Sequence, residues 1–349
     1  MDIRVKSESI AEARAFSDWR LYDADPEETC ALPNQEQAGK GTLAPEVARE
    51  GVRPDMDRPW QEYGVLSMNL RRFADTLREH CKEESQHNPF AAFLLDIQDE
   101  SSGHRAIRYR AQAMGGFYAL KHIPLRPIPL DKLHGINVAA KKLALSSKLR
   151  TDGGLLLCVG DTGAGKSTGA NAVVRERLLK YGGYCLTLAD PLETPLGDDG
   201  GHRVGTNGYV DEVDVRSIGF TAALEHALRA FPIGAPGMLY YGEVRSNSNS
   251  VDLLNIACDG HEVITTVHGM TPDAAVTRLI ATATRAGLAP EIAREQIAQS
   301  LRGVLFHSYA YGSWQIRAYE ASDRILQGIR DGSPAPFRVA AAQQSGMAA

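Results

Sequence analysis

Residues 155–167 read LLLCVGDTGAGKS, and this stretch decides the fold of the larger part of the chain. A short apolar run leads into the pattern GxxxxGK[ST], and a helix-like sequence continues to Leu179. Glycines in such a loop let successive backbone N–H groups face inward around phosphates, and the start of the following helix adds partial positive charge. Strand, loop and helix is the setting that this motif requires, so the segment predicts a nucleotide site.

The side chains of the loop suggest a division of labour. We expect Lys166 to bind the β- and γ-phosphate oxygens of ATP and the Ser167 hydroxyl to ligate Mg²⁺. The alternative, a glycine-rich turn with an exposed lysine, is disfavoured by the strand and the helix on either side. The predicted nucleotide-binding residues are Gly160, Thr162, Gly163, Ala164, Gly165, Lys166, Ser167 and Thr168.

Three further apolar runs end in side chains suited to phosphate chemistry. Residues 186–188 lead to Asp190 and Glu193, residues 238–241 lead to Glu243, and residues 262–267 end at His268. In an open parallel sheet the carboxyl ends of the strands line one crevice. Glu193, Glu243 and His268 are therefore expected to converge on one nucleotide.

Composition narrows the class of protein. The 349 residues carry a formal net charge of -5, with a pI near 6.1, which disfavours nucleic acid as the main partner. The opening MDIRVKSESI has no apolar core of a signal peptide, and no apolar run approaches the roughly 20 residues of a membrane span. The five cysteines show no metal-ligand spacing. These features predict a cytoplasmic protein.

Composition shifts along the chain predict five segments. Residues 1–58, polar and broken by prolines, are expected to be a poorly ordered extension, and residues 334–349 a flexible tail. Apolar residues at helical spacing from Leu66 to Cys81, with strand-like runs after them, predict a small α+β domain over residues 59–122. Residues 123–132, rich in proline, are expected to be a linker. Alternating strands and helices predict an α/β domain with a parallel sheet over residues 133–333.

The ordered segments GDTGAGKST, ADPLET, YYGEVR and GHEVITTVHG make the chain similar to a known family. They resemble the Walker A motif, aspartate box, Walker B motif and histidine box of the type II/type IV secretion ATPases, especially the twitching-motility branch. The resemblance implies a RecA-like P-loop core behind a small PAS-like amino domain. It leaves the first 60 residues unmatched.

The resemblance also implies roles for single residues. Glu243 would orient the attacking water and help to position Mg²⁺, Glu193 would join that network with Asp190 in support, and His268 would sense the γ-phosphate. The alternatives are a surface acid for Glu243, a backbone-capping turn for Asp190 and Glu193, and a local hydrogen bond for His268. Ala189, where many relatives carry an acid, leaves the completeness of this box open.

Arginines would neutralise charge that develops on the γ-phosphate. By resemblance, Arg229 and Arg245 are candidates within the core, although Ser246 replaces the aspartate that usually follows Arg245. Candidates for action across a subunit boundary are Arg105, Arg108 and Arg110. Each of these could instead be a solvated charge.

Taken together, the resemblance implies a homo-hexameric ATPase that uses ATP and Mg²⁺ to drive a type IV pilus or a type IV secretion or conjugative machine. It would dock peripherally at the inner face of the cytoplasmic membrane, on platform or secretion-machine proteins. Two alternatives remain open at this point: a nucleotide-dependent assembly or regulatory module that does not hydrolyse, and a motor that translocates nucleic acid. The acidic balance of the chain disfavours the second.

Overall fold

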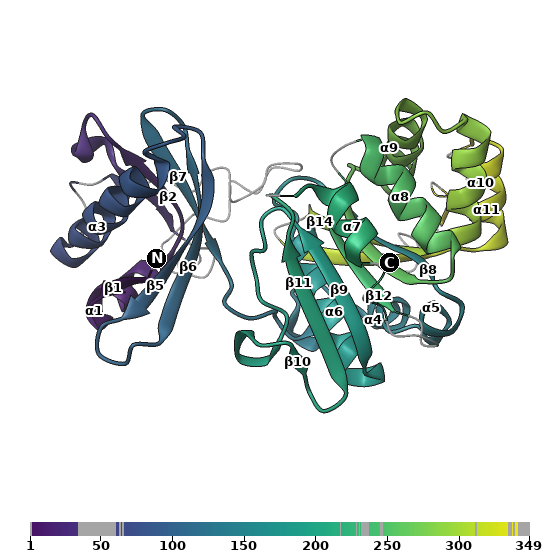
Figure 1. Cartoon of the computed structure of the whole chain (residues 1–349), viewed down its shortest axis with the longest axis horizontal. Helices are drawn as coiled ribbons and strands as arrows, with labels where there is room; N and C mark the ends of the chain where they lie inside the picture. Colours follow the sequence, from purple (N-terminus) through teal and green to yellow (C-terminus); the bar gives the residue numbers. More distant parts are fainter. Residues whose placement is uncertain are drawn as a thin grey trace. The chain divides into compact units, whose positions relative to one another are not determined.

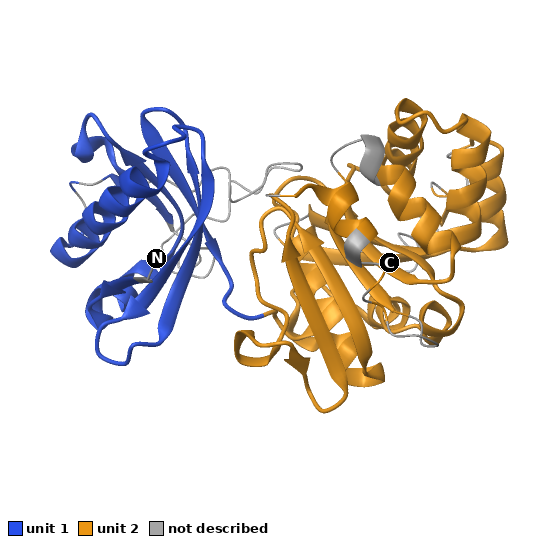
Figure 2. Ribbon diagram, in the orientation of Figure 1, with its two compact units in different colours: residues 1–126 blue, residues 127–349 orange. Residues whose placement is uncertain are grey.

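The computed structural model divides the chain into two compact units, residues 1–126 and 127–349 (Figure 2). It describes residues 2–33, 61–62, 64, 66–216, 218–227, 229, 231, 237–244, 247–310, 313–333, 337 and 339–340. The boundary falls inside the predicted linker, residues 123–132. The last part of that linker, η4 (Leu130–Lys132), is already a 3-10 turn whose Leu130 is buried in the core of the second unit.

The first unit is an α+β domain built on a seven-stranded sheet (Figure 1). Its strands lie in the order β1-β5-β6-β7-β2-β3-β4, and helices α1 and α3 pack against each other. The elements are β1 (Asp2–Val5), α1 (Ser7–Ala13), β2 (Phe16–Tyr22), η1 (Pro26–Glu28), β3 (Cys30–Pro33), β4 (Gln61–Glu62), α3 (Met68–Ser85), β5 (Ala92–Asp99), β6 (Arg105–Ala113) and β7 (Phe117–Ile123). The helix expected from the apolar spacing between Leu66 and Cys81 is α3.

The prediction that residues 1–58 form a poorly ordered extension is wrong for residues 2–33. That segment supplies β1, β2 and β3, and Trp19 and Leu21 of β2 are fully buried. Charged residues between the apolar ones hid the alternation of the strand in the sequence. Pro26 and Pro33 interrupt nothing, because one begins a 3-10 turn and the other ends a strand. Residues 34–58 of the predicted extension lie outside the described residues.

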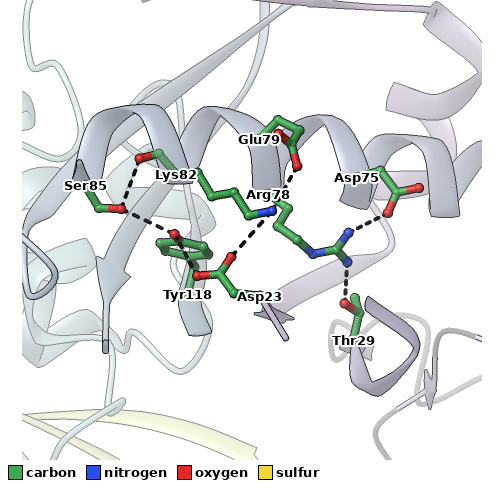
Figure 3. A network of polar contacts seen from close by, with 8 residues as sticks. All are labelled: Asp23, Thr29, Asp75, Arg78, Glu79, Lys82, Ser85 and Tyr118. Carbon is green, nitrogen blue, oxygen red and sulfur yellow. Dashed lines mark hydrogen bonds and ion pairs between the residues drawn. The ribbon is translucent and has the colours of Figure 1, made fainter. Parts of the chain in front are cut away.

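Polar contacts tie this early segment to α3 (Figure 3). Arg78, on the buried side of α3, donates from Nη2 to Thr29 Oγ1 at 2.6 Å and from Nη1 to Asp75 Oδ1 at 2.7 Å. The hydroxyl of Tyr118 donates to Asp23 Oδ2 at 3.1 Å. Buried hydrogen bonds to a guanidinium stabilise a fold by roughly 1.5–3 kcal/mol each. The first thirty-odd residues are therefore an integral part of the domain.

The second unit is an α/β domain with a parallel sheet, as the alternating pattern predicted (Figure 1). Strands β11, β9, β12, β13, β8 and β14 are parallel, and antiparallel β10 and β15 flank them. The elements after η4 are α4 (Val138–Ala144), α5 (Ser147–Asp152), β8 (Gly154–Gly160), α6 (Lys166–Tyr181), β9 (Gly183–Ala189), η5 (Asp198–Gly200), β10 (Arg203–Val204), β11 (Gly208–Asp214), α7 (Phe220–Ala227), β12 (Met238–Glu243), α8 (Asn247–Cys258), β13 (Glu262–His268), α9 (Pro272–Arg285), α10 (Pro290–Ser300), β14 (Leu301–Ala310), β15 (Ser313–Glu320) and α11 (Asp323–Arg330).

Helices cover both faces of this sheet, so its central strands are apolar on both sides. In β8, Leu155 and Leu157 join the cluster beneath α8, α9 and α10, whereas Leu156 and Cys158 join the cluster beneath α4 and α6. This is why the strand reads as a continuous apolar run. Among the described residues, no helix is long and apolar enough to cross a membrane.

Only part of the predicted tail, residues 334–349, can be placed. Phe337 is buried, with its ring centroid 6.5 Å from that of Tyr319. Residues 339 and 340 are helical, and the remainder of the predicted tail lies outside the described residues.

Candidate functional site

The phosphate loop joins β8 to α6 along the middle of the sheet. Gly165 adopts the left-handed conformation (φ 78°) that a side chain would strain, and α6 begins directly after it at Lys166. The helix has no side-chain cap at its N-terminus. The first backbone N–H groups of a helix have no partner within it, and they carry the positive end of the helix dipole. The N-terminus of α6 is therefore suited to bind an anion.

Lys166 is turned inward rather than toward solvent. It is 6% exposed, and its Nζ donates to the carbonyl oxygen of Asp161 at 2.9 Å. The same Nζ lies 3.1 Å from Nδ1 of His268. The alternative of a glycine-rich turn with an exposed lysine does not describe this geometry. The other loop side chains differ, since Ser167 and Thr162 are exposed and Ala164 is buried.

His268 connects Lys166 to Glu243. His268 ends β13, and Glu243 ends the neighbouring strand β12. Nε2 of His268 lies 2.7 Å from Oε1 of Glu243. A lysine ammonium can only donate hydrogen bonds, so Nδ1 of His268 is the acceptor. The ring hydrogen is then on Nε2, which donates a hydrogen bond to the carboxylate of Glu243. Both side chains stay partly open to solvent, 32% for His268 and 21% for Glu243. The three residues form one chain of hydrogen bonds at the carboxyl edge of the sheet.

This arrangement keeps the imidazole of His268 neutral. Partial burial is the main cause that lowers the pKa of His268 from its ordinary value, and the charge of Lys166 lowers it further. Glu243 acts in the opposite direction, but the net effect is a lowered pKa for His268. A neutral ring is what the acceptor role of Nδ1 requires.

The aspartate box follows β9, and its two acids, Glu193 and Asp190, lie in different environments. Glu193 is half-buried, and its carboxylate acts with that of Glu243 to raise the pKa of the buried Tyr240 hydroxyl beyond the effect of burial alone. Glu193 and Glu243 therefore share one electrostatic neighbourhood. Asp190 is exposed and acts instead on Arg216.

Arg216 is a charged residue at the carboxyl edge of the sheet that was not predicted from the sequence. It follows β11, and its guanidinium binds Asp214 through Nε at 2.9 Å and Nη2 at 2.6 Å. Asp214 first, and Asp190 with it, raise the pKa of Arg216 against the effect of burial. No motif marks this residue. Only the pairing of β11 with β9 brings it beside the aspartate box.

The structure brings the predicted arginines into different settings. In the first unit, Asp96 on β5 binds Arg108 at 2.6 Å and Arg105 at 3.1 Å, both from β6. Arg110 stands on the same strand and is half-buried. Arg229 is exposed. Arg245 lies outside the described residues.

His261 and His268 stand at opposite ends of β13. The ring of His261 packs against Phe231, with centroids 4.9 Å apart, whereas His268 lies beside Lys166 and Glu243. Six residues of strand lie between them, so they cannot share a ligand. In the described part of the chain, no group of three or more His, Cys, Asp or Glu side chains is arranged to hold a metal ion by itself.

The chain is similar to known proteins in sequence and in fold. A model of the family described as Type II/IV secretion system protein matches residues 111–308, more than half of the chain. The type IV pilus ATPase PilU of Pseudomonas aeruginosa is 32% identical over 140 residues, covering 40% of this chain and 33% of PilU. The uncharacterized protein YggR of Escherichia coli is 31% identical over 195 residues, covering 56% and 55%. The matched part of the chain thus spans between a third and just over half of these relatives.

Solved structures match almost the whole chain. The pilus retraction motor PilT with bound ADP superposes with a TM-score of 0.66 at 19% identity, covering 97% of this chain and 89% of that one. The ATPase DotB of Legionella pneumophila gives 0.65 at 17% identity, covering 95% and 84%. These matches confirm the predicted fold, a RecA-like core preceded by a small α+β domain.

Proposed function

Because the chain belongs to the type II/IV secretion system protein family, we propose that it hydrolyses ATP and converts the energy into mechanical work. The observation that carries the proposal is the hydrogen-bond chain from Lys166 through His268 to Glu243 at the start of α6. Lys166, the proposed phosphate-binding cation, and Glu243, the proposed water-orienting carboxylate, lie on either side of one imidazole. Relatives named as ATPases support the reaction class.

The side chains fit a magnesium nucleotide. The helix start without a side-chain cap and the inward Lys166 suit the phosphates, and the exposed Ser167 hydroxyl and Glu243 suit Mg²⁺ and its water ligands. The metal ion would neutralise charge on the phosphate oxygens when bound. These are acceptors and donors of the types that each group requires.

Each residue then has a physical task. Lys166 exchanges its contacts with Asp161 and His268 for phosphate oxygens, which frees Nδ1 of His268. Glu243 accepts a hydrogen bond from the attacking water and holds it in line, since phosphoryl transfer needs an oriented nucleophile more than a strong base. Glu193, in the same electrostatic neighbourhood, helps to hold the water and metal network.

His268 reports the change at Lys166. Its ring stays neutral, and its Nε2–H bond to Glu243 couples the lysine to the catalytic carboxylate. Departure of Lys166 toward a phosphate leaves His268 free to reorient, and this displaces Glu243. This is the sensing role that the family resemblance assigned to it.

The same proposal covers assembly and place of action. We place the protein in a homo-hexamer docked at the inner face of the cytoplasmic membrane, where it drives a pilus or a secretion machine. The relatives named for pili and type II secretion support this setting. Arg105, Arg108 and Arg110, together on β6, are the proposed contributors to a neighbouring subunit's site.

The test is phosphate release at saturating ATP by the wild type, Glu243→Gln and Lys166→Met. We expect Glu243→Gln to lower kcat by about 10²–10⁴ while nucleotide affinity stays close to that of the wild type, since the carboxylate acts on the water. Lys166→Met removes the phosphate contact and should abolish binding. Equal turnover in Glu243→Gln and the wild type would contradict the catalytic role. Binding without turnover in the wild type would favour the module that does not hydrolyse.

A further inference from the structure

His307 is a buried polar side chain that none of the motifs includes. It lies on β14, is 3% exposed, and faces α6, because Leu305 two residues earlier belongs to the cluster beneath that helix. Its Nε2 is buried and has no hydrogen-bond partner within the described residues. A buried nitrogen without a partner lowers the stability of the fold. An apolar side chain of similar size would avoid this cost.

The ring of His307 lies against the first turn of α6, directly after the phosphate loop. Gly169, one turn into α6, has no room for a side chain, since a Cβ there would lie 2.2 Å from Cε1 and 2.9 Å from Nε2 of His307. A glycine inside a helix is less favourable than an alanine. The close approach of the imidazole is a physical reason for this glycine.

The same residue also adjoins the point where the loop leaves the sheet. His307 is the register partner of Gly160, the last residue of β8. A Cβ on Gly160 would lie 3.2 Å from Cβ of His307. The segment from Gly160 to Gly169, which contains every predicted phosphate-binding residue, therefore starts and finishes against one side chain.

The charge state of His307 suits a side chain that fixes the distance between β14 and α6. Burial first, and the charge of Lys166 second, lower its pKa to about 4. The ring is neutral at physiological pH, so it adds no second cation beneath Lys166. It can hold the helix close without repelling the lysine.

We propose that His307 is a positioning residue for the phosphate loop, one that sets the distance between the end of β8 and the first turn of α6. This inference rests on the proposed nucleotide site. A change in that distance moves the backbone N–H groups and Lys166 relative to the phosphates, and displacements of about 1 Å in such sites can cost about 10²-fold in rate. The effect falls on phosphate binding, not only on stability.

The experiment uses the full chain and fluorescent ADP as the probe, with thermal unfolding measured in parallel. His307→Ala removes the spacer, and Gly169→Ala pushes against it from the helix side. Each single change should raise the Kd by about tenfold, which corresponds to about 1.4 kcal/mol. The double variant, in which the new methyl group enters the space left by the ring, should bind within about threefold of the wild type.

Val304→Ala is the matched control. Val304 is a fully buried residue of the same strand that belongs to the cluster on the opposite face. It should lower the unfolding temperature and leave the Kd unchanged. The proposal is overturned if His307→Ala and Gly169→Ala bind ADP as tightly as the wild type, or if the double variant is no better than the singles.

Lys166→Met separates this inference from the proposed function. Loss of binding in Lys166→Met with unchanged binding in His307→Ala would sink the positioning role alone. Equal binding by Lys166→Met and the wild type, or no binding by the wild type, would overturn the nucleotide site and the inference with it.

Discussion

The two ends of the parallel sheet in the second unit differ in how far their charged side chains are buried. At the amino ends of the strands, Arg177 of α6 and Glu262 of β13 form an ion pair whose side chains are 0% and 1% exposed. At the carboxyl ends, Lys166, His268 and Glu243 form a chain of contacts in which His268 and Glu243 remain partly exposed. The same helix and the same strand contribute to both ends.

The difference separates charges that hold the fold from charges that meet a ligand. Arg177 also donates from Nη1 to the carbonyl oxygens of Ala144 at 2.8 Å and Ser146 at 3.1 Å, so the pair joins α6, β13 and the segment between α4 and α5. No solvent reaches it. At the carboxyl end, His268 and Glu243 stay partly accessible, and this is the end at which open α/β sheets bind ligands.

The largest effect is expected at the amino end. Glu262→Leu leaves the guanidinium of Arg177 buried without its counter-charge, and such a change costs about 3–5 kcal/mol of unfolding free energy. Denaturant unfolding measures it. The variant Glu262→Leu/Arg177→Met should recover at least half of the loss, because the uncompensated charge is gone. A loss below about 1 kcal/mol in Glu262→Leu would remove the contrast between the two ends.

A smaller effect is expected from His307, the buried group behind the carboxyl end. Its pKa, about 4 in the folded chain, lies below the value of about 6.5 for an exposed histidine. The unfolded chain therefore binds the proton first, so stability is full above about pH 6.5 and falls as the pH drops toward 4. The shift corresponds to about 3 kcal/mol.

The difference between the wild type and His307→Gln isolates this contribution. Unfolding free energies of both proteins are measured from pH 7.5 to pH 4. The wild type should lose more stability than the variant across that window. Parallel pH profiles would mean that the ring is not held neutral by burial.

The smallest effect is expected at Arg216, which is paired but half-exposed. Its ion pair with Asp214 is partly open to solvent, with exposed fractions of 38% for Arg216 and 29% for Asp214. Ion pairs of this kind contribute about 0–1 kcal/mol. Arg216→Ala should therefore change the unfolding free energy by less than about 1 kcal/mol. A loss as large as that of Glu262→Leu would show that exposure does not distinguish the two ends.

The sequence was informative where chemistry is local. GxxxxGK[ST] predicted the loop and the start of α6, and the acids and histidine after apolar runs predicted which strand ends carry the site. The rule that parallel strands end at one edge then brought Glu243 and His268 together. The roles of all these site residues, and those of the candidate arginines, stay predictions.

Features that depend on distant pairing could not be read from the sequence. Lys166 and His268 are separated by 102 residues, and their direct contact follows only from the order of β8 and β13 in the sheet. His307 and Arg216 belong to no motif and gain their neighbours from β14 and β11. In the first unit, the strands before residue 34 were hidden because charged residues alternate with the buried ones, as in β2.

Soon after the first unit ends, the chain is attached to β15 of the second unit through residues 135 and 136. Ile316 donates its N–H to the carbonyl oxygen of Gly135 at 2.9 Å, and Ile136 forms a parallel bridge with Ile316. Leu130 and Leu133 are buried just before this point. Ile128 packs against the core of the second unit, so residues 124–127 alone join the last strand of the first unit to that core. Two of these four residues are prolines, and at about 3.1 Å per residue they span about 12 Å. The covalent link between the two units is therefore short and stiffened by proline.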